Sequence, residues 1–210
     1  MSGVPGSAGD LGHATPPPPV PLRTERLVLR YVREDDAEGL RRYYGREDVT
    51  RHLLDGPWDA EHAVDQARYR SGRKHITQAG FATVLVAELV DGSEGAEGAE
   101  AGRLVGDISL WAVDDSLSHG EVSWVVDPEL GGQGYATEMA RAVLDLGFGH
   151  YGMHRIQAQV ESRNEASARL CERLGMRREA HLRRNWLIKG EWTDTLVYGL
   201  LAEEFAAGET

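Results

Sequence analysis

Residues 125–138 read Val-Val-Asp-Pro-Glu-Leu-Gly-Gly-Gln-Gly-Tyr-Ala-Thr-Glu, and this stretch decides the fold. The apolar run ends at Asp127-Pro128, because proline lacks the N–H that a sheet ladder needs and disfavours helix at the residue before it. Three glycines within four residues allow a tight bend and a close approach to a ligand. A helical pattern follows at once, so unpaired N–H groups and the positive end of a helix dipole suit a phosphate. A turn that binds nothing can carry the same glycines, so both interpretations stay open.

Two common phosphate motifs do not fit this turn. A P-loop continues with Gly-Lys-Ser/Thr, whereas Gly134 is followed by Tyr135-Ala136. A dinucleotide fingerprint needs a glycine where Thr137 stands. We therefore expect a pyrophosphate turn of another kind.

The turn resembles the coenzyme A loop of the GNAT N-acetyltransferase superfamily, whose pattern is Gln/Arg-x-x-Gly-x-Gly/Ala. The match covers residues 131–136, with glycine at the first position in place of Gln or Arg. The resemblance implies acetyl-CoA as cosubstrate and no metal ion. It also implies that backbone groups of the preceding strand hold the pantetheine arm. The cofactor-binding residues expected from this segment are Val125, Val126, Gly131, Gly132, Gln133, Gly134, Tyr135 and Ala136.

A second segment, residues 164–176, resembles the family pattern Asn-x-x-Ser-x-x-Leu-Tyr-Glu-Lys-Leu-Gly-Phe. The resemblance implies that Asn164 contacts the cofactor, and asparagine is also a good helix N-cap. Many family members have a catalytic tyrosine where this chain has Cys171, which we expect to be a buried residue without a catalytic role. Ser167 is then the candidate acid, or else a small packing residue.

Two arginines of the same predicted helix, Arg169 and Arg173, are candidates for the 3′-phosphate of the cofactor. Ordinary solvated helix charges are the alternative for both. We expect Arg169 among the cofactor-binding residues.

Acyl transfer to an amine also needs a route for a proton, because an alkylammonium cannot attack a thioester. Glu121 opens the strand before the glycine turn, and it resembles an acidic residue that acts in the family directly or through water. Alternation places Glu121 on one face of the strand with Ser123 and Val125. A half-exposed strand carboxylate without catalytic duty is the alternative.

Residues 185–198 resemble a hairpin of the ribosomal-protein-alanine and -serine N-acetyltransferases. Members of that branch acetylate protein N-termini or small-molecule amines, so the acceptor stays open. The sequence thus predicts an N-acetyltransferase that moves acetyl from acetyl-CoA to a primary amine in a ternary complex. The alternatives are a noncatalytic acyl-CoA-binding or sensor module, a protein-interaction domain, and a transferase for a longer acyl-CoA.

The order of elements predicts an α/β fold, and the resemblance implies the GNAT acyl-CoA N-acyltransferase fold. We expect a mixed, mostly antiparallel sheet of about seven strands flanked by helices. Residues 1–21 contain Pro16-Pro17-Pro18-Pro19 and predict a disordered tail, residues 22–204 the acetyltransferase domain, and residues 91–102 an acidic flexible loop. Strands are expected at 24–31, 81–90, 103–113, 121–126, 155–160, 183–188 and 193–201, and helices at 35–44, 59–71, 136–148 and 164–174.

The amino-acid composition limits the classes of partner that we expect. A net charge of −11 argues against nonspecific nucleic-acid binding and is compatible with cationic substrates. No apolar run approaches the roughly 20 residues that span a membrane. One cysteine in 210 residues favours the cytoplasm. The sequence leaves the oligomeric state open, a homodimer included.

Overall fold

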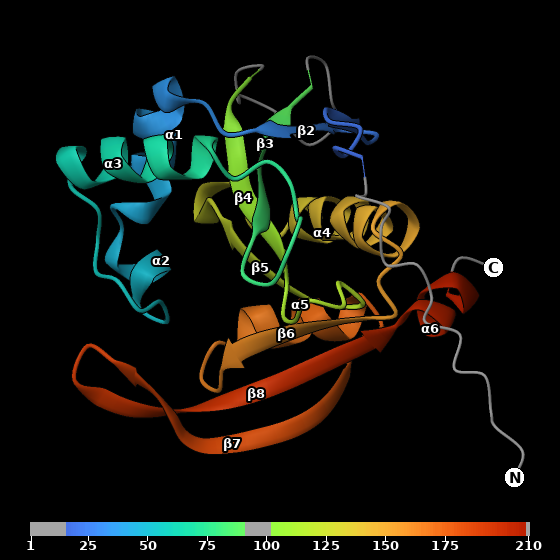
Figure 1. Cartoon of the computed structure of the whole chain (residues 1–210). Helices are drawn as coiled ribbons and strands as arrows, with labels where there is room; N and C mark the ends of the chain where they lie inside the picture. The colour runs from blue at the N-terminus through green and yellow to red at the C-terminus, as the bar shows by residue number, and fades with distance from the viewer. Residues whose placement is uncertain (1–15, 91–101, 209–210) are drawn as a thin grey trace, which may run out of the picture.

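The computed structural model describes residues 16–90 and 102–208, which form one sheet with helices on both faces (Figure 1). The strands are β1 (Leu22–Arg23), β2 (Leu27–Tyr31), β3 (Ala82–Leu89), β4 (Leu104–Ala112), β5 (His119–Val126), β6 (Arg155–Glu161), β7 (Arg177–Ile188) and β8 (Glu191–Leu201). The helices are α1 (Ala37–Tyr44), α2 (Glu47–Thr50), α3 (Ala60–Ser71), α4 (Tyr135–Asp145), α5 (Glu165–Arg173) and α6 (Ala202–Ala207).

The sheet has eight strands in the order β1-β2-β3-β4-β5-β6-β8-β7. All neighbours in the described sheet are antiparallel except β5 and β6, which are parallel. The predicted mixed, mostly antiparallel α/β fold is therefore confirmed. The additional strand is β1, whose two residues pair with Val28 and Leu29 and are too few to give a periodic signal.

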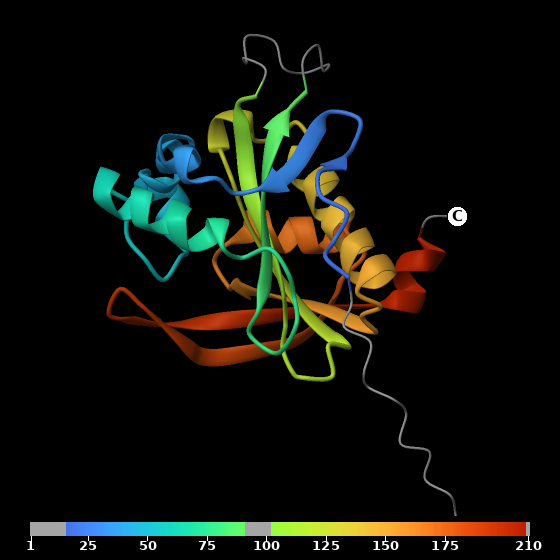
Figure 2. The same cartoon turned by 45° about the horizontal axis from the view of Figure 1, so that its top comes forward.

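Two hydrophobic cores cover the two faces of the sheet. Helices α4 and α5 bury Met139, Leu144 and Leu170 in the larger core, whereas α1 and α3 bury Leu40 and Ala67 in the smaller one. Figure 2 shows α1 and α3 on one side of β3 and β4, and α4 on the other. These apolar residues recur at helical spacing, which is why the helices were predictable.

The parallel pair separates soon after it begins. Strand β6 pairs with β5 only at His119, Gly120 and Glu121, although β5 continues to Val126. Strand β4 covers the other edge of β5 as far as Val126. The edge of residues 122–126 that faces β6 therefore lacks a ladder partner. Backbone groups at such an edge are available to a ligand.

The C-terminal hairpin is longer than predicted. Strand β7 begins at Arg177 rather than residue 183, and most of its residues are exposed, so no apolar alternation marked its start. The turn is the tight pair Lys189-Gly190, with φ of 47° and 85°. Two short helices, α2 and α6, were also missed, because four and six residues are too few for a helical pattern.

The predicted tail and acidic loop lie largely outside the described residues, at 1–15 and 91–101. Residues 16–21 are described and contact the domain. Pro18 is buried, Val20 packs against the larger core, and the Pro16 carbonyl lies 2.9 Å from Nε2 of His150. No helix in the described ranges is long and apolar enough to cross a membrane.

Candidate active site

The glycine-rich turn joins β5 to α4 in the way the sequence predicts. Asp127 is buried and accepts a 3.0 Å hydrogen bond from Glu129 N–H, which starts a short 3-10 turn at Pro128–Leu130. Burial acts to raise the pKa of Asp127, but hydrogen bonds from Arg103, from Glu129 N–H and from Arg42 hold this pKa below its usual range. The carboxylate therefore fixes the point at which the strand ends.

The bend itself depends on two glycines with positive φ, Gly132 at 78° and Gly134 at 85°. The N–H of Thr137 is the first after the bend with an intramolecular acceptor, the Gly134 carbonyl. Within the described residues, the N–H groups of residues 132–136 have no acceptor. A run of unpaired N–H groups at the start of a helix is a site for an anion. The turn thus offers a row of hydrogen-bond donors to an anion.

Arg26 of the strand β2 region supports the turn from behind. Its guanidinium donates to the Gln133 carbonyl at 2.9 Å, lies 4.5 Å from the centre of the Tyr135 ring, and pairs with Glu138 of α4 at 2.7 Å. The ring of Tyr135 is buried, and the Oε1 atom of Gln133 is buried without a partner in the described structure. Gln133 and Tyr135 therefore offer a ligand their backbone groups rather than their side chains.

Three cavities follow one another along β5, and we number them from the helix α4 side. Cavity 1, about 840 Å³, lies over the turn and the first turns of α4, and Arg23, Arg141 and Arg173 line it. Cavity 2, about 590 Å³, runs from Gly131 and Gly132 along the free edge of β5 to α5. Cavity 3, about 290 Å³, lies beyond it, between the C-terminal hairpin and the stretch from α2 to the start of α3 (residues 47–59), which we call the α2–α3 segment.

Cavities 2 and 3 meet at one junction, defined by the residues that line both. These residues are His52, Leu53, Trp124, Val125, Asn164 and Ser167. The indole N–H of Trp124 lies 3.4 Å from the Ser167 hydroxyl, and the Asn164 side chain accepts a 3.1 Å hydrogen bond from Ser167 N–H. Asn164 is thus the N-cap of α5 and also faces both cavities. A long thin ligand in cavity 2 would meet a second ligand from cavity 3 at this place.

The far wall of cavity 3 is aromatic and rigid. The rings of Tyr44 and Trp58 stack with centroids 3.8 Å apart, and the Arg70 guanidinium lies 4.8 Å and 4.9 Å from the two ring centres. Arg70 pairs at 2.6 Å with Asp107, a buried carboxylate of β4 that also accepts from the hydroxyls of Tyr43 and Tyr44. This network anchors α1 and α3 to the sheet, since breaking a buried ion pair costs several kcal/mol, about 3–5.

Most of the predicted site residues lie together. Val125, Val126, Gly131, Gly132, Ala136, Asn164 and Ser167 line cavity 2, and Gly134 and Tyr135 line cavity 1. Three predicted residues, Gln133, Glu121 and Arg169, line none of the cavities. Glu121 is absent from the linings of cavities 1–3, and its carboxylate accepts from the side-chain amides of Gln157 and Gln159 at 2.7 Å and 3.1 Å. Arg169 is also absent from them and pairs with Glu165 at 2.9 Å.

Cys171 is fully buried, as expected from its position on α5. Burial raises the pKa of its thiol to about 12, so the reactive thiolate is scarce near neutral pH. A covalent acyl-cysteine at this position is therefore disfavoured.

The sequence did not identify His52 as a site residue. Its Nδ1 lies 2.6 Å from Oε2 of Glu161, a carboxylate 109 positions away that is 2% exposed. The two residues approach each other only because the α2–α3 segment folds over the end of β6. A histidine in a short irregular segment carries no pattern from which this contact could be read.

Comparisons with known proteins identify the family of this chain. Residues 26–177 match the family described as "Acetyltransferase (GNAT) domain". The uncharacterized N-acetyltransferase YoaA of Bacillus subtilis is 30% identical over 86% of this chain and 96% of its own length. The spermidine N(1)-acetyltransferase of Escherichia coli is 25% identical over 52% of this chain and 61% of its own length. A solved GNAT-family acetyltransferase from Bacillus anthracis is 27% identical, covers 87% of this chain and 98% of its own, and superposes with a TM-score of 0.73. Members of this family use acyl-CoA. The chain therefore belongs to the GNAT family and is an N-acetyltransferase.

Proposed function

We propose that this N-acetyltransferase transfers acetyl from acetyl-CoA directly to a primary amine while both substrates are bound. The junction of cavities 2 and 3 carries the proposal. In this proposal, the pyrophosphate of acetyl-CoA binds the N–H groups of residues 132–136, and the pantetheine arm follows the free edge of β5 past Val126 and Val125 to the junction. The thioester then lies beside Trp124 and Ser167, where an amine in cavity 3 can reach it.

Coenzyme A itself supplies the activated acyl group when bound, and the chain orients it. Unpaired backbone groups of β5 beyond Glu121 are placed to stabilise charge on the thioester oxygen. The Ser167 hydroxyl at the junction can pass a proton to the leaving thiolate. We expect Ser167→Ala to lower kcat while the acetyl-CoA dissociation constant stays within about twofold.

The acceptor we infer is a primary amine on a cationic molecule. Trp186 and the carboxylates of Asp55 and Glu161 line cavity 3, and an aromatic face and carboxylates both attract ammonium groups. Arg70 also lines this cavity, but its charge is paired with Asp107 and its guanidinium lies over the rings of Tyr44 and Trp58. The spermidine acetyltransferase among the relatives makes polyamines one candidate. The resemblance of residues 185–198 to the ribosomal-protein branch makes a protein N-terminus another. A longer acyl donor remains the alternative for cavity 2.

An assay for the release of the CoA thiol tests the proposal with peptides, polyamines and aminoglycosides as acceptors and acyl-CoAs of increasing length as donors. We expect turnover with at least one primary amine. Initial rates at varied concentrations of both substrates should give intersecting lines, as a ternary complex requires. Parallel lines, or acetyl label that stays on the protein without an amine, would contradict direct transfer. Cys171→Ala should remain active.

A further inference from the structure

His52 occupies a special place at the junction. Of the six residues that line both cavities 2 and 3, it alone has a side chain with a basic nitrogen that can accept a proton. It is partly exposed, whereas its partner Glu161 is buried. The imidazole therefore faces the cavities from a fixed support.

Glu161 decides which nitrogen of the ring is available. One carboxylate oxygen, Oε1, accepts from the Arg163 guanidinium at 2.9 Å, and the other lies 2.6 Å from Nδ1 of His52. A carboxylate accepts hydrogen bonds, so Nδ1 carries the proton and the lone pair is on Nε2. A histidine oriented in this way by a buried carboxylate can act as a general base, and the carboxylate stabilises the imidazolium that forms.

We propose that His52 is the general base of acetyl transfer, positioned by Glu161, and this inference rests on the proposed function. Nε2 of His52 takes one proton from the ammonium of the acceptor. The freed nitrogen lone pair forms the C–N bond to the thioester carbon, and the C–S bond breaks. The second proton from nitrogen goes to the thiolate through the Ser167 hydroxyl. The products are an N-acetyl amide, the CoA thiol and one proton, which His52 returns to solvent.

Other charged groups also face this region and will influence a pH profile. Asp48 and Asp55 lie on the same segment as His52. Arg163 lies on the turn after β6, and Glu165 lies on the helix that follows it. From the hairpin, Lys189 donates to the Thr50 carbonyl at 2.6 Å. Arg70 lies on α3 and pairs with Asp107. Arg163 and Glu191 form a further pair at 3.1 Å.

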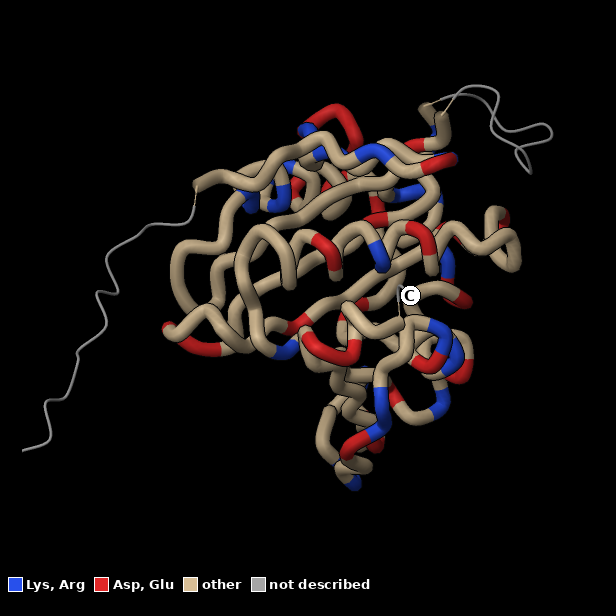
Figure 3. The backbone as a smooth tube through the Cα atoms, turned by 90° about the vertical axis from the view of Figure 1, so that its right-hand side faces the viewer, with Lys and Arg blue, Asp and Glu red and all other residues tan. Residues whose placement is uncertain are grey.

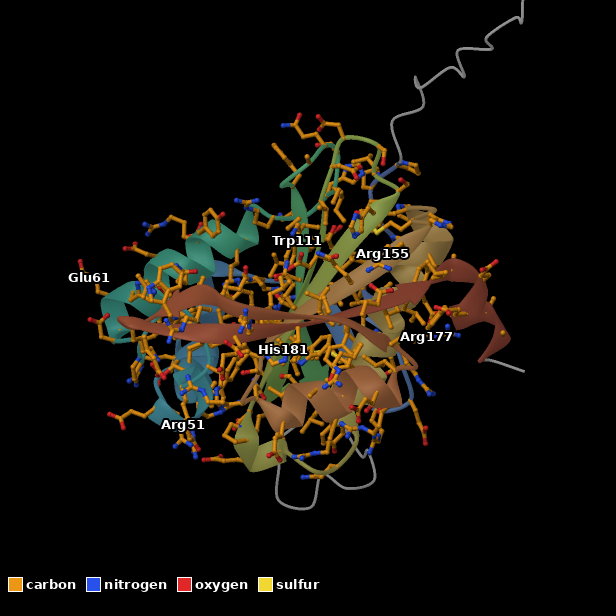
Figure 4. All side chains as sticks on the ribbon, turned by 90° about the horizontal axis from the view of Figure 1, so that it is seen from below. Arg51, Glu61, Trp111, Arg155, Arg177 and His181 are labelled. Carbon is orange, nitrogen blue, oxygen red and sulfur yellow. The ribbon has the colours of Figure 1, made fainter. Side chains whose placement is uncertain are left out.

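The test is His52→Asn, whose amide can still donate to Glu161 in place of Nδ1 but has no counterpart of Nε2. We expect kcat at pH 7 to fall by about 10² to 10⁴, the range of general-base catalysis. The acetyl-CoA dissociation constant, measured by calorimetry, should stay within about twofold, which also shows that the variant folds. A matched control is His181→Asn on the C-terminal hairpin (Figure 4), which breaks an exposed 2.7 Å pair with Asp194 and should leave turnover unchanged.

The pH profile separates a base from a structural contact. In His52→Asn only the amine that is already deprotonated in solution reacts, so kcat/KM should rise about tenfold per pH unit until the amine itself titrates. For the unchanged chain, kcat/KM should stay constant over the same pH range. Glu161→Gln keeps an acceptor for Nδ1–H but removes the charge that stabilises the imidazolium. It should lower kcat less than His52→Asn does and move the acid limb of the profile to lower pH.

Turnover of His52→Asn within about threefold of the unchanged chain, or a pH profile parallel to it, would overturn the role of His52 and leave the proposed function intact. An acid limb that does not move in Glu161→Gln would overturn the role of Glu161. Failure of the unchanged chain to release CoA thiol with any acceptor would overturn the proposed function itself.

Discussion

At the residue scale, the proposed coenzyme site depends on backbone conformation more than on side chains. Gly132 has no atom within 4 Å of where a Cβ would stand, so only its φ of 78° demands glycine. Gly134 has a φ of 85°, and an added Cβ would lie 3.3 Å from the Arg26 guanidinium. The amide directions at the bend follow from these two angles.

Replacing Gly132 by alanine should weaken both the turn and the cofactor site. A non-glycine residue in the left-handed region costs about 1–3 kcal/mol, which we expect as the loss in free energy of unfolding in urea. If the bend relaxes to avoid this strain, its N–H groups turn away, and the acetyl-CoA dissociation constant should rise at least about tenfold. Gly80→Ala is the control, since Gly80 has a φ of 75° and equally open surroundings. It should lose similar stability and bind acetyl-CoA normally; equal binding by both variants would contradict the role of the turn.

At the element scale, the sequence revealed what is local and missed what depends on how elements dock. The glycine turn, the long helices and most strands were predictable because glycine placement and periodicity act over short distances. Arg169 and Arg173 lie four positions apart and so on the same side of α5, and only the place at which the helix docks along its axis decides which of them reaches the cavities. His52 and Glu161 meet across the fold, and Glu121 turned toward β6 because Gln157 and Gln159 pair with it. Sequence patterns carry no information on these encounters.

The orientation of α5 gives a direct comparison of two arginines. Arg173 lines cavities 1 and 2 and lies 3.3 Å from the Thr137 hydroxyl at the start of α4, whereas Arg169 pairs with Glu165. We expect Arg173→Gln to raise KM for acetyl-CoA severalfold with little change in kcat, because it removes a positive charge beside the proposed phosphate site. Arg169→Gln should change KM less than twofold. Steady-state kinetics at low ionic strength would decide, and the reverse order would favour the residue predicted from sequence.

At the scale of the whole molecule, a strongly acidic protein must bind a polyanionic cofactor. Both signs of charge occur along the described chain (Figure 3), and both line the cavities. Cavity 1 is lined by Arg23, Arg141 and Arg173 with Glu25, Glu138 and Asp145, and cavity 3 by Asp55 and Glu161 with Arg70. The net charge of −11 therefore opposes the cofactor from a distance and favours a cationic acceptor.

The dependence of kcat/KM on salt concentration should reveal whether the net charge favours a cationic acceptor. A tenfold increase in NaCl shortens the Debye length about threefold, which screens the long-range field but affects close ion pairs less. We expect kcat/KM for a polyamine acceptor to fall severalfold between 20 and 200 mM NaCl (roughly 22 Å to 7 Å of screening length), and kcat/KM for a singly charged amine to fall less. Equal dependence for the two acceptors would show that the overall charge plays no part in capture.

The walls of cavities 1 and 2 and the walls of cavity 3 come largely from separate stretches of the chain. Cavities 1 and 2 are built mainly on β5, α4 and α5, whereas the outer walls of cavity 3 come from the α2–α3 segment and the hairpin. A hydrogen bond from Lys189 to the Thr50 carbonyl connects this segment with the hairpin. The preference for an acceptor can therefore change among relatives through these two parts of the chain, while the cavities proposed for acetyl-CoA stay the same. Chimeras that swap only residues 54–58 and 183–192 between relatives leave His52 and the lining of cavity 2 unchanged, and they should change which acceptor is preferred.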